Sequence, residues 1–290
     1  MEGIAPLGNA SPSGTGYASY YLDDGDHNGL PVLYPYFGGC YVKPGDPAWF
    51  TILRTMTKDC DGQAGMEELL TADTGRGYAC DGLFLDTLDT PAPNSFGGTR
   101  YEWTTPAYQA LLQAISTQYP DKLLLGNRGL FFYNPNLKTY RYTLRPYLNL
   151  VMFESYYTDS SNSGLPSAYF DDNKFNYAPK LNAEAGRADG FTVICLGYDP
   201  TPPLPPATIQ QDFAEAQGEQ GWPLYRTLPS LDAPFHTGAA DWNAAHPDTS
   251  PPVWDSTAAQ AADSDPATPG NQPPPARTGI QQAVAGGIGQ

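Results

Sequence analysis

Basic residues are scarce in this sequence. The 290 residues include 15 Lys and Arg against 31 Asp and Glu, which gives a formal net charge of -16, and only 16% of the residues are charged. Such a protein would repel the backbone of a nucleic acid, so we expect no nucleic-acid partner. The acidity either solubilises an exported protein or attracts a cationic substrate, and the sequence leaves both explanations open.

Long apolar segments are also absent. No run approaches the roughly 20 residues that a membrane-spanning helix needs, so we expect no membrane span. Residues 1–16 lack the basic and apolar regions of a signal peptide. Export therefore has no direct signal in this chain and has to be argued from function.

Several common functional motifs are missing as well. There is no Gly-x-Ser-x-Gly element, no Gly-x-Gly-x-x-Gly or P-loop, and no Cys-x-x-Cys pair. The histidines and cysteines do not have the spacing of metal ligands. They are His27, His236, His246, Cys40, Cys60, Cys80 and Cys195. We expect neither a resident metal nor a cofactor. A disulfide between Cys40 and Cys60 and a set of four buried thiols are both consistent with the sequence.

Short apolar runs that end in polar residues recur along the chain. Runs of this length without polar alternation are typical of strands covered on both faces, and such strands are parallel. In chain order the runs are 17–22, 82–85, 123–125, 148–153, 191–197 and 222–225. The polar residues at their ends are Asp23, Asp86, Asn127, Glu154, Tyr198 with Asp199, and Arg226.

Helical patterns lie between several of these runs. Thr105 is expected to cap a helix that starts at Pro106 and buries one apolar face. Segments 65–71 and 206–220 are predicted as two further helices. This βαβα alternation predicts an α/β protein, specifically a (β/α)8 TIM barrel, in which chemistry collects at the C-terminal ends of the strands. A doubly wound sheet would also place ligands there, but its glycine motif is absent.

The expected domain organisation has four parts. About six strands can be counted over 17–243, whereas a closed barrel has eight, so we expect a barrel over 17–243 that is incomplete at its N-terminus or degenerate. Residues 1–16 are predicted to be an unstructured lead-in. Residues 244–276 have the Pro-rich composition of a linker, and 277–290 resemble the first strand of a truncated β-sandwich module.

Three motifs together carry a family resemblance. They are Asp-Gly-Leu-Phe-Leu-Asp-Thr-Leu-Asp at 81–89, Gly-Asn-Arg-Gly at 126–129 and Phe-Glu-Ser-Tyr at 153–156, each at a predicted strand end. In this order they resemble the polygalactosaminidase family of glycoside hydrolases, in particular the hydrolase domains associated with Pel-type exopolysaccharide. The resemblance extends over about residues 17–227.

The resemblance implies an enzyme that cleaves α-1,4-linked galactosamine or N-acetylgalactosamine polysaccharide, which can be cationic. It also implies a secreted or periplasmic protein, and we expect a monomer. The family's two catalytic carboxylates map to Asp86 and Glu154. Where the family has a strand that ends in Gly-Glu, this chain has Asp26 after Gly25, a shorter acid whose role is open.

The two-carboxylate chemistry has its own geometric requirement. Glycosidic cleavage needs one carboxyl that protonates the leaving oxygen and one carboxylate that acts as nucleophile or activates water. If Asp86 and Glu154 end strands two apart in a parallel sheet, their carboxyls come within about 10 Å. Glu154 follows an apolar run, where an acid needs a partner or stays protonated, which suits a general acid. The sequence does not distinguish retention from inversion.

Each assignment has a structural alternative. Asp86 at a strand end is also typical of a helix cap or a turn former, and Glu154 could be a buried acid paired with Arg128 or Arg145. Side chains expected to bind substrate are Asp26, Asp89, Asn127, Arg128, Tyr156, Tyr198 and Asp199. Asn127 and Arg128 are also candidates for orienting Glu154.

Two other functions remain open at this point. The chain could be a polysaccharide-binding module on a decayed barrel, which would bind without turnover. It could also be a metal-dependent hydrolase that uses the aspartates of 23–26, since hard cations are held by several oxygens. Loss of activity with a chelator would separate the last function from the other two.

Overall fold

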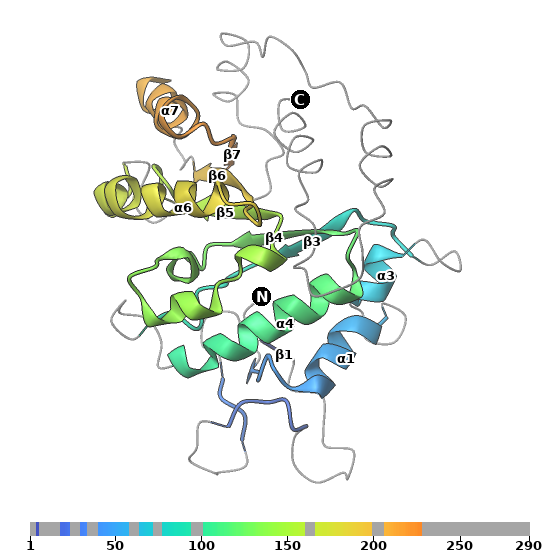
Figure 1. The fold of residues 1–290 in the computed structure, drawn as a ribbon. Helices are drawn as coiled ribbons and strands as arrows, with labels where there is room; N and C mark the ends of the chain where they lie inside the picture. Colours follow the sequence, from blue (N-terminus) through green and yellow to red (C-terminus); the bar gives the residue numbers. More distant parts are fainter. Residues whose placement is uncertain are drawn as a thin grey trace. The chain divides into compact units, whose positions relative to one another are not determined.

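The computed structural model divides into two compact units, which are described separately (Figure 1). The first comprises Met1–Phe132 and Asn136–Tyr147, and the second comprises Tyr133–Pro135 and Leu148–Gln290. The residues that the structure describes are 4–5, 18–23, 30–33, 40–57, 64–71, 77–93, 101–159, 166–198 and 206–227. The predicted linker 244–276 and the predicted module at 277–290 lie outside these residues.

The first unit alternates short strands and helices. Its strands are β1 (Ile4–Ala5), β2 (Cys40–Tyr41), β3 (Gly82–Leu85) and β4 (Leu123–Asn127). Its α-helices are α1 (Pro47–Thr55), α3 (Met66–Leu70) and α4 (Thr105–Gln118), and its 3-10 turns are η3 (Glu102–Thr104), η4 (Leu130–Tyr133), η5 (Lys138–Tyr142) and η6 (Arg145–Tyr147). β3 and β4 pair in parallel, with Leu85 opposite Gly126. The strands predicted at 82–85 and 123–125 and the helix predicted at 65–71 are therefore confirmed.

Helix α4 connects β3 to β4 and buries the apolar face that the sequence predicts. The buried residues of this face are Tyr108, Leu111, Leu112 and Ile115. The predicted cap is wrong, because the helix already begins at Thr105, and the Thr105 hydroxyl donates back to the carbonyl of Glu102 and also lies 3.3 Å from the carbonyl of Pro91. The turn η3 runs directly into α4, so the Thr105 N–H also has its acceptor in the turn, at Glu102. A side-chain cap is not required at a helix start of this kind.

The predicted parallel strand at 17–22 is wrong for its described residues. The Tyr21 N–H donates to the carbonyl of Ala18 across a turn, and Tyr21 makes an isolated antiparallel bridge with Val42. Because the turn interrupts the apolar run, the segment cannot continue as a parallel strand. Its aromatic residues instead build a buried cluster, which consists of Tyr20, Tyr21, Cys40, Val42 and Trp49.

The lead-in predicted at 1–16 contains a paired segment. Ile4 lies opposite Tyr41 and Ala5 opposite Cys40 in the antiparallel pair of β1 and β2. The prediction of an unstructured segment therefore does not hold for these two residues, because their backbone groups pair with β2.

The second unit consists of three parallel strands with helices between them. β5 (Leu150–Glu154) pairs with β6 (Thr192–Tyr198), and β6 pairs with β7 (Leu224–Thr227). Between β5 and β6 lie α5 (Phe170–Asp172), the π-helical turn η8 (Asn173–Tyr177) and α6 (Ala178–Ala185). Between β6 and β7 lie α7 (Pro206–Phe213) and the π-helical turn η9 (Ala214–Glu219). The three strands and the helical segment predicted at 206–220 are therefore confirmed.

The π-helical turn η8 has a cause in the sequence. It lies directly before α6, whose second residue is Pro179. Proline has no N–H to donate to the carbonyl four residues earlier, and its ring clashes with that carbonyl in a regular α-helix. A wider turn before the proline accommodates both effects.

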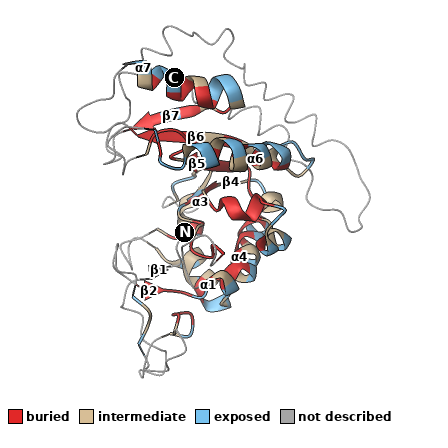
Figure 2. Cartoon of the chain, turned by 90° about the vertical axis from the view of Figure 1, so that its left-hand side faces the viewer, coloured by how far each residue is buried: buried red, intermediate tan, exposed pale blue. Residues whose placement is uncertain are grey.

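Aromatic side chains fill the core of the second unit. Tyr156 makes edge contacts with Phe153, Phe170 and Trp222, at centroid distances of 5.2, 5.6 and 5.3 Å. The Trp222 indole N–H donates to the side-chain carbonyl of Asn182 on α6 (2.9 Å), so it is satisfied although the ring is buried. In Figure 2, β6 and β7 are largely buried, whereas α6 and α7 carry exposed residues on one side.

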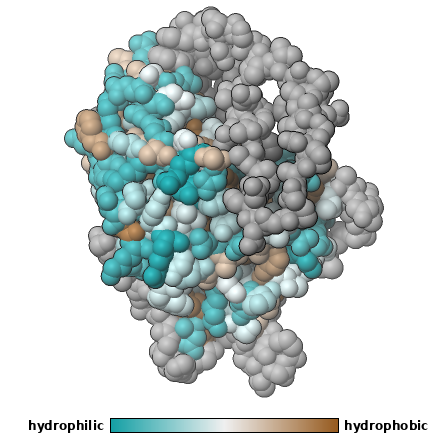
Figure 3. Space-filling model, in the orientation of Figure 1, coloured by the Kyte–Doolittle hydropathy of each residue, from teal (hydrophilic) through white to brown (hydrophobic). Residues whose placement is uncertain are grey.

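Both units are of the α/β type, with parallel pairing between strands that helices connect. The closed eight-stranded barrel stays a prediction. On the face shown in Figure 3 most of the described surface is hydrophilic. Within the described residues, no helix combines the length and the apolar character that crossing a membrane requires.

Candidate active site

Asp86 and Asn127 lie side by side where β3 and β4 end. Leu85 lies opposite Gly126 in the parallel register, so the residues that follow them, Asp86 and Asn127, are neighbours. The Asn127 side-chain amide donates to Asp86 Oδ1 (2.8 Å). Asn127 was expected to bind substrate or to orient Glu154. In the structure it orients Asp86.

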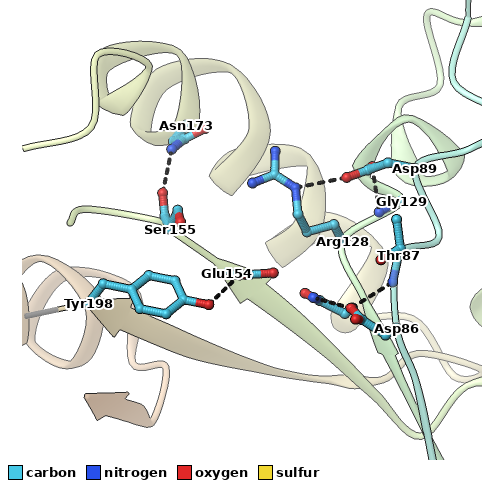
Figure 4. A network of polar contacts seen from close by, with 10 residues as sticks. Asp86, Thr87, Asp89, Arg128, Gly129, Glu154, Ser155, Asn173 and Tyr198 are labelled. Atoms are coloured by element: carbon cyan, nitrogen blue, oxygen red, sulfur yellow. Dashed lines mark hydrogen bonds and ion pairs between the residues drawn. The ribbon is translucent and has the colours of Figure 1, made fainter. Parts of the chain in front are cut away.

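Among the described residues, the hydrogen bonds to Asp86 reach one of its two carboxylate oxygens. Oδ1 accepts from the Asn127 amide and also from the backbone N–H of Thr87 (2.7 Å; Figure 4). The residue is exposed, and among the described residues Oδ2 has no hydrogen-bond partner. Asp86 is therefore fixed in direction with its second oxygen open. A helix cap would instead have its carboxylate engaged by the first turn of a helix.

Asp89 and Arg128 form an ion pair in the same unit. Arg128 Nε lies 2.9 Å from Asp89 Oδ2, and the Gly129 N–H donates to Asp89 Oδ1 (3.0 Å). The side chains are 39% and 38% exposed, so solvent screens the pair and its contribution to stability is small, about 0–1 kcal/mol. Its main effect is to hold the loop after β3 against the loop after β4.

Left-handed backbone follows the proposed site residues. Thr87 (φ 53°) comes directly after Asp86, Arg128 (φ 60°) after Asn127, and Ser155 (φ 59°) after Glu154. Only a few per cent of residues other than glycine have such φ values, and for a β-branched residue like threonine they are genuine outliers. Strain of this kind clusters at functional sites, where it is part of how a side chain is presented.

We expect Thr87→Gly to raise the free energy of unfolding by about 0.5 to 1 kcal/mol. Glycine removes the left-handed backbone penalty of about 1–2 kcal/mol. Part of this gain is lost, because glycine raises the conformational entropy of the unfolded chain. Gly129→Ala is the matched opposite, because Gly129 has φ 65° and an added Cβ would lie 3.0 Å from Leu88 Cβ, so it should lower stability. Urea unfolding measures both, and changes of the same sign would contradict the assignment of strain.

Glu154 is held in the second unit by Tyr198. The Tyr198 hydroxyl donates to Glu154 Oε1 (Figure 4). Glu154 ends β5 opposite Leu196, so β6 continues for two residues beyond it and Tyr198 is its last residue. Tyr198 is buried, whereas Glu154 is half-buried. The tyrosine predicted to bind substrate therefore binds the proposed catalytic acid through its hydroxyl.

Asn173 stabilises the turn that follows Glu154 through side-chain hydrogen bonds. Its side-chain amide donates to the carbonyls of Ser155 (3.2 Å) and Tyr156 (2.9 Å), and the Ser155 N–H donates to Leu196 on β6 (2.9 Å). Asn173 is the first residue of the π-helical turn η8. The helical segment between β5 and β6 thus fixes the left-handed backbone at the end of β5.

The expectation that Tyr156 lines a substrate cleft does not fit its position. The side chain is 1% exposed and lies among the aromatic rings of the core. Burial raises the pKa of the Tyr156 hydroxyl well above its usual range. Ring contacts with Phe153, Phe170 and Trp222 account for its burial, so we assign Tyr156 to packing.

The remaining expected residues have different outcomes. Asp26 and Asp199 lie outside the described residues, as do the three histidines and Cys60. Cys40 is a buried free thiol, and burial raises its pKa. Among the described residues no group of three or more His, Cys, Asp or Glu side chains could hold a metal ion.

Asp86 belongs to the first unit and Glu154 to the second. The expectation that their carboxyls lie within about 10 Å stays a prediction. Each unit by itself has the same construction, in which an acid at a strand end has one oxygen engaged by a neutral donor from the adjacent strand.

Comparison with known proteins gives a structural likeness. No protein-family model and no curated protein matches the sequence. The chain is similar in structure to the glycoside hydrolase domain of PelA from Pseudomonas aeruginosa. The two share 23% identity over 71% of this chain and 70% of that one, with a TM-score of 0.43. A single-residue variant of the same domain gives 20% identity over 70% of each chain and a TM-score of 0.44.

Four polar residues near the site were not singled out for a role from the sequence. They are Thr158, Asn173, Asp212 and Arg226, and all are buried in the second unit. Arg226 was noted only as the polar residue after the last predicted strand. The one usable signal was the place of Arg226 in an apolar segment, because an arginine that is buried there needs a carboxylate partner.

Proposed function

We propose that this chain is a glycoside hydrolase that cleaves α-1,4-linked galactosamine or N-acetylgalactosamine polysaccharide with Asp86 and Glu154. The observation that carries the proposal is the state of the two acids at strand ends. Asp86 Oδ1 accepts from Asn127, Asp86 Oδ2 has no hydrogen-bond partner among the described residues, and Glu154 Oε1 accepts from Tyr198. The three family-like motifs contribute the identity of the substrate.

The proposed chemistry follows from which oxygens are engaged. The Tyr198 hydroxyl donates to Glu154 Oε1, and in the proposed mechanism Glu154 delivers a proton to the leaving glycosidic oxygen from its other oxygen, Oε2. Asp86 then acts as the ionised partner through Oδ2, either as nucleophile or as base toward water. Asn127 and the Thr87 N–H occupy Oδ1 with hydrogen bonds, so the proposal assigns the reaction to Oδ2.

The test is product analysis on a defined polymer. Partly deacetylated α-1,4-galactosamine polymer is incubated with the protein, and soluble products are identified by mass spectrometry. Shorter oligomers of the same sugar are the expected result. Binding of the polymer with no products would instead favour a non-catalytic polysaccharide-binding module, and loss of activity with a chelator would favour a metal-dependent hydrolase.

We also expect the rate on cationic polymer to depend on salt. Partly deacetylated chains carry ammonium groups, and a protein of net charge -16 attracts them over a distance that salt shortens to about 8–10 Å under physiological conditions. The value of kcat/KM for this polymer should fall as sodium chloride rises from about 0.05 to 0.5 M, while a fully N-acetylated oligomer responds much less.

The matched variant for this prediction neutralises several acids that the sequence places near predicted strand ends. Changing Asp23, Asp24, Asp26 and Asp199 to asparagine should flatten the salt response without abolishing cleavage. Equal salt dependence for the cationic and the acetylated substrate would mean that the acidity serves solubility alone.

A further inference from the structure

A fully buried ion pair lies in the second unit outside the proposed chemistry. Arg226 on β7 and Asp212 on α7 are both 0% exposed, and Arg226 Nη1 contacts Asp212 Oδ2. Removing two charges from water costs several kcal/mol per ion, and a buried pair is often no more stabilising than apolar side chains of the same size. The pair therefore calls for an explanation other than stability.

The ion pair orients the hydroxyl of Thr158. This hydroxyl donates to Asp212 Oδ2 (3.1 Å) and accepts from Arg226 Nη1 (3.5 Å) and from the backbone N–H of Tyr198 (3.0 Å). A threonine hydroxyl has one proton to donate and two lone pairs to accept with. All three are used, so the hydroxyl has a single orientation, and Thr158 is itself 0% exposed.

The backbone of Tyr198 is held on both sides by this group. Its N–H donates to Thr158, and its carbonyl accepts from Arg226 Nη2 (3.4 Å). The preceding residue, Gly197, lets the group approach, because a Cβ there would lie 2.5 Å from Asp212 Oδ2 and 3.0 Å from Thr158 Oγ1. Glycine is the residue type that permits such an approach to a strand.

We propose that Thr158 is a positioning residue for Glu154, and that it acts through Tyr198. The Arg226–Asp212 pair fixes Thr158, Thr158 fixes the backbone of Tyr198, and the buried Tyr198 ring carries its hydroxyl to Glu154 Oε1. A rigid, buried ring transmits a shift of its backbone to the hydroxyl at its far end. The inference rests on the proposed function of Glu154, but the geometry it concerns can be tested without turnover.

The test compares Thr158→Val with Thr158→Ser. Valine keeps the shape and removes the hydroxyl, whereas serine keeps the hydroxyl and removes a methyl group. The protein is labelled with 13C at the ζ carbon of tyrosine, and the Tyr198 signal is identified by its loss in Tyr198→Phe. We expect the Tyr198 signal to move in Thr158→Val and to stay in place in Thr158→Ser.

Turnover is the second measurement. In Thr158→Val we expect kcat to fall at least about tenfold with KM nearly unchanged, since small misplacements of a catalytic group cost on this scale, and Thr158→Ser should stay within about threefold of wild type. If Thr158→Val does not fold, Gly197→Ala is the second variant, because its Cβ displaces Asp212 and Thr158 while the hydroxyl is kept. It should move the same signal.

The outcomes separate this inference from the proposed function. An unchanged Tyr198 signal in Thr158→Val, or an equal displacement in Thr158→Ser, overturns the positioning role. A Tyr198 signal that moves in Thr158→Val but not in Thr158→Ser supports the positioning role, whether or not the polymer is cleaved. If the wild-type protein does not cleave the polymer, the glycosidase proposal fails while the NMR result still decides the role of Thr158.

Discussion

Replacing Glu154 with glutamine is expected to lower kcat at least about a hundredfold, because an amide can neither deliver a proton to the leaving oxygen nor act as a carboxylate. Stability should change by less than about 1 kcal/mol, since Glu154 is half-buried and the glutamine side-chain oxygen can still accept from the Tyr198 hydroxyl. Steady-state kinetics on the galactosamine polymer and thermal unfolding measure the two effects.

A second acid and a remote acid provide the controls. Asp86→Asn should have a similar effect, and the double variant of Asp86 and Glu154 should be little worse than the more damaging single change, because residues that act in one step are not additive. Asp121→Asn should leave kcat unchanged, since Asp121 is exposed just before β4, at the end of the strand away from the site. Near-normal turnover in Glu154→Gln, or a loss matched by unfolding, would contradict the assignment.

Replacing Arg226 with methionine is expected to lower the free energy of unfolding by about 3–5 kcal/mol. The change leaves the carboxylate of Asp212 buried without its cation, and breaking one partner of a buried pair has a cost of this size. Among the residues that the structure describes, Asp212 Oδ1 has no hydrogen-bond partner that could compensate the charge. Chemical denaturation at neutral pH measures the loss.

The matched double variant separates the ion pair from simple packing. Arg226→Met combined with Asp212→Leu should recover most of the lost stability, because an apolar pair of similar volume often equals a buried ion pair. Arg128→Met breaks a pair of the same chemistry that is more than a third exposed, and it should cost less than about 1 kcal/mol. If Arg226→Met lowers the free energy of unfolding only slightly, the ion pair is not buried as the structure has it. If the double variant recovers no stability, both side chains serve packing.

The parallel strands could be predicted because their signal is local. The run at 150–154 is apolar until Glu154, which is what a strand covered on both faces requires, and the structure has β5 there. The run at 17–22 carries a similar signal, but a turn at Ala18 interrupts it. Turn formation depends on what the following residues can pair with, and here the partner is Val42, more than twenty residues away.

The candidate site divides in the same way. Asp86 and Asn127 could be placed together because parallel strands in register bring their C-terminal ends to one edge. The contact between Tyr198 and Glu154 could not, since it depends on β6 continuing two residues past β5. Thr158 and Asp212 carry no local pattern at all, because their function arises only when α7 packs against the strands of its unit.

The π-helical turn before Pro179 places a constraint on chain length. Such a turn closes each hydrogen-bonded ring over one residue more than an α-turn, so the segment Asn173–Tyr177 holds an extra residue compared with a regular helix. Removing one residue there would rotate Asn173 by about 100° relative to α6, away from the carbonyls of Ser155 and Tyr156. Related chains that keep this support for Glu154 should therefore tolerate substitutions in the segment far better than deletions.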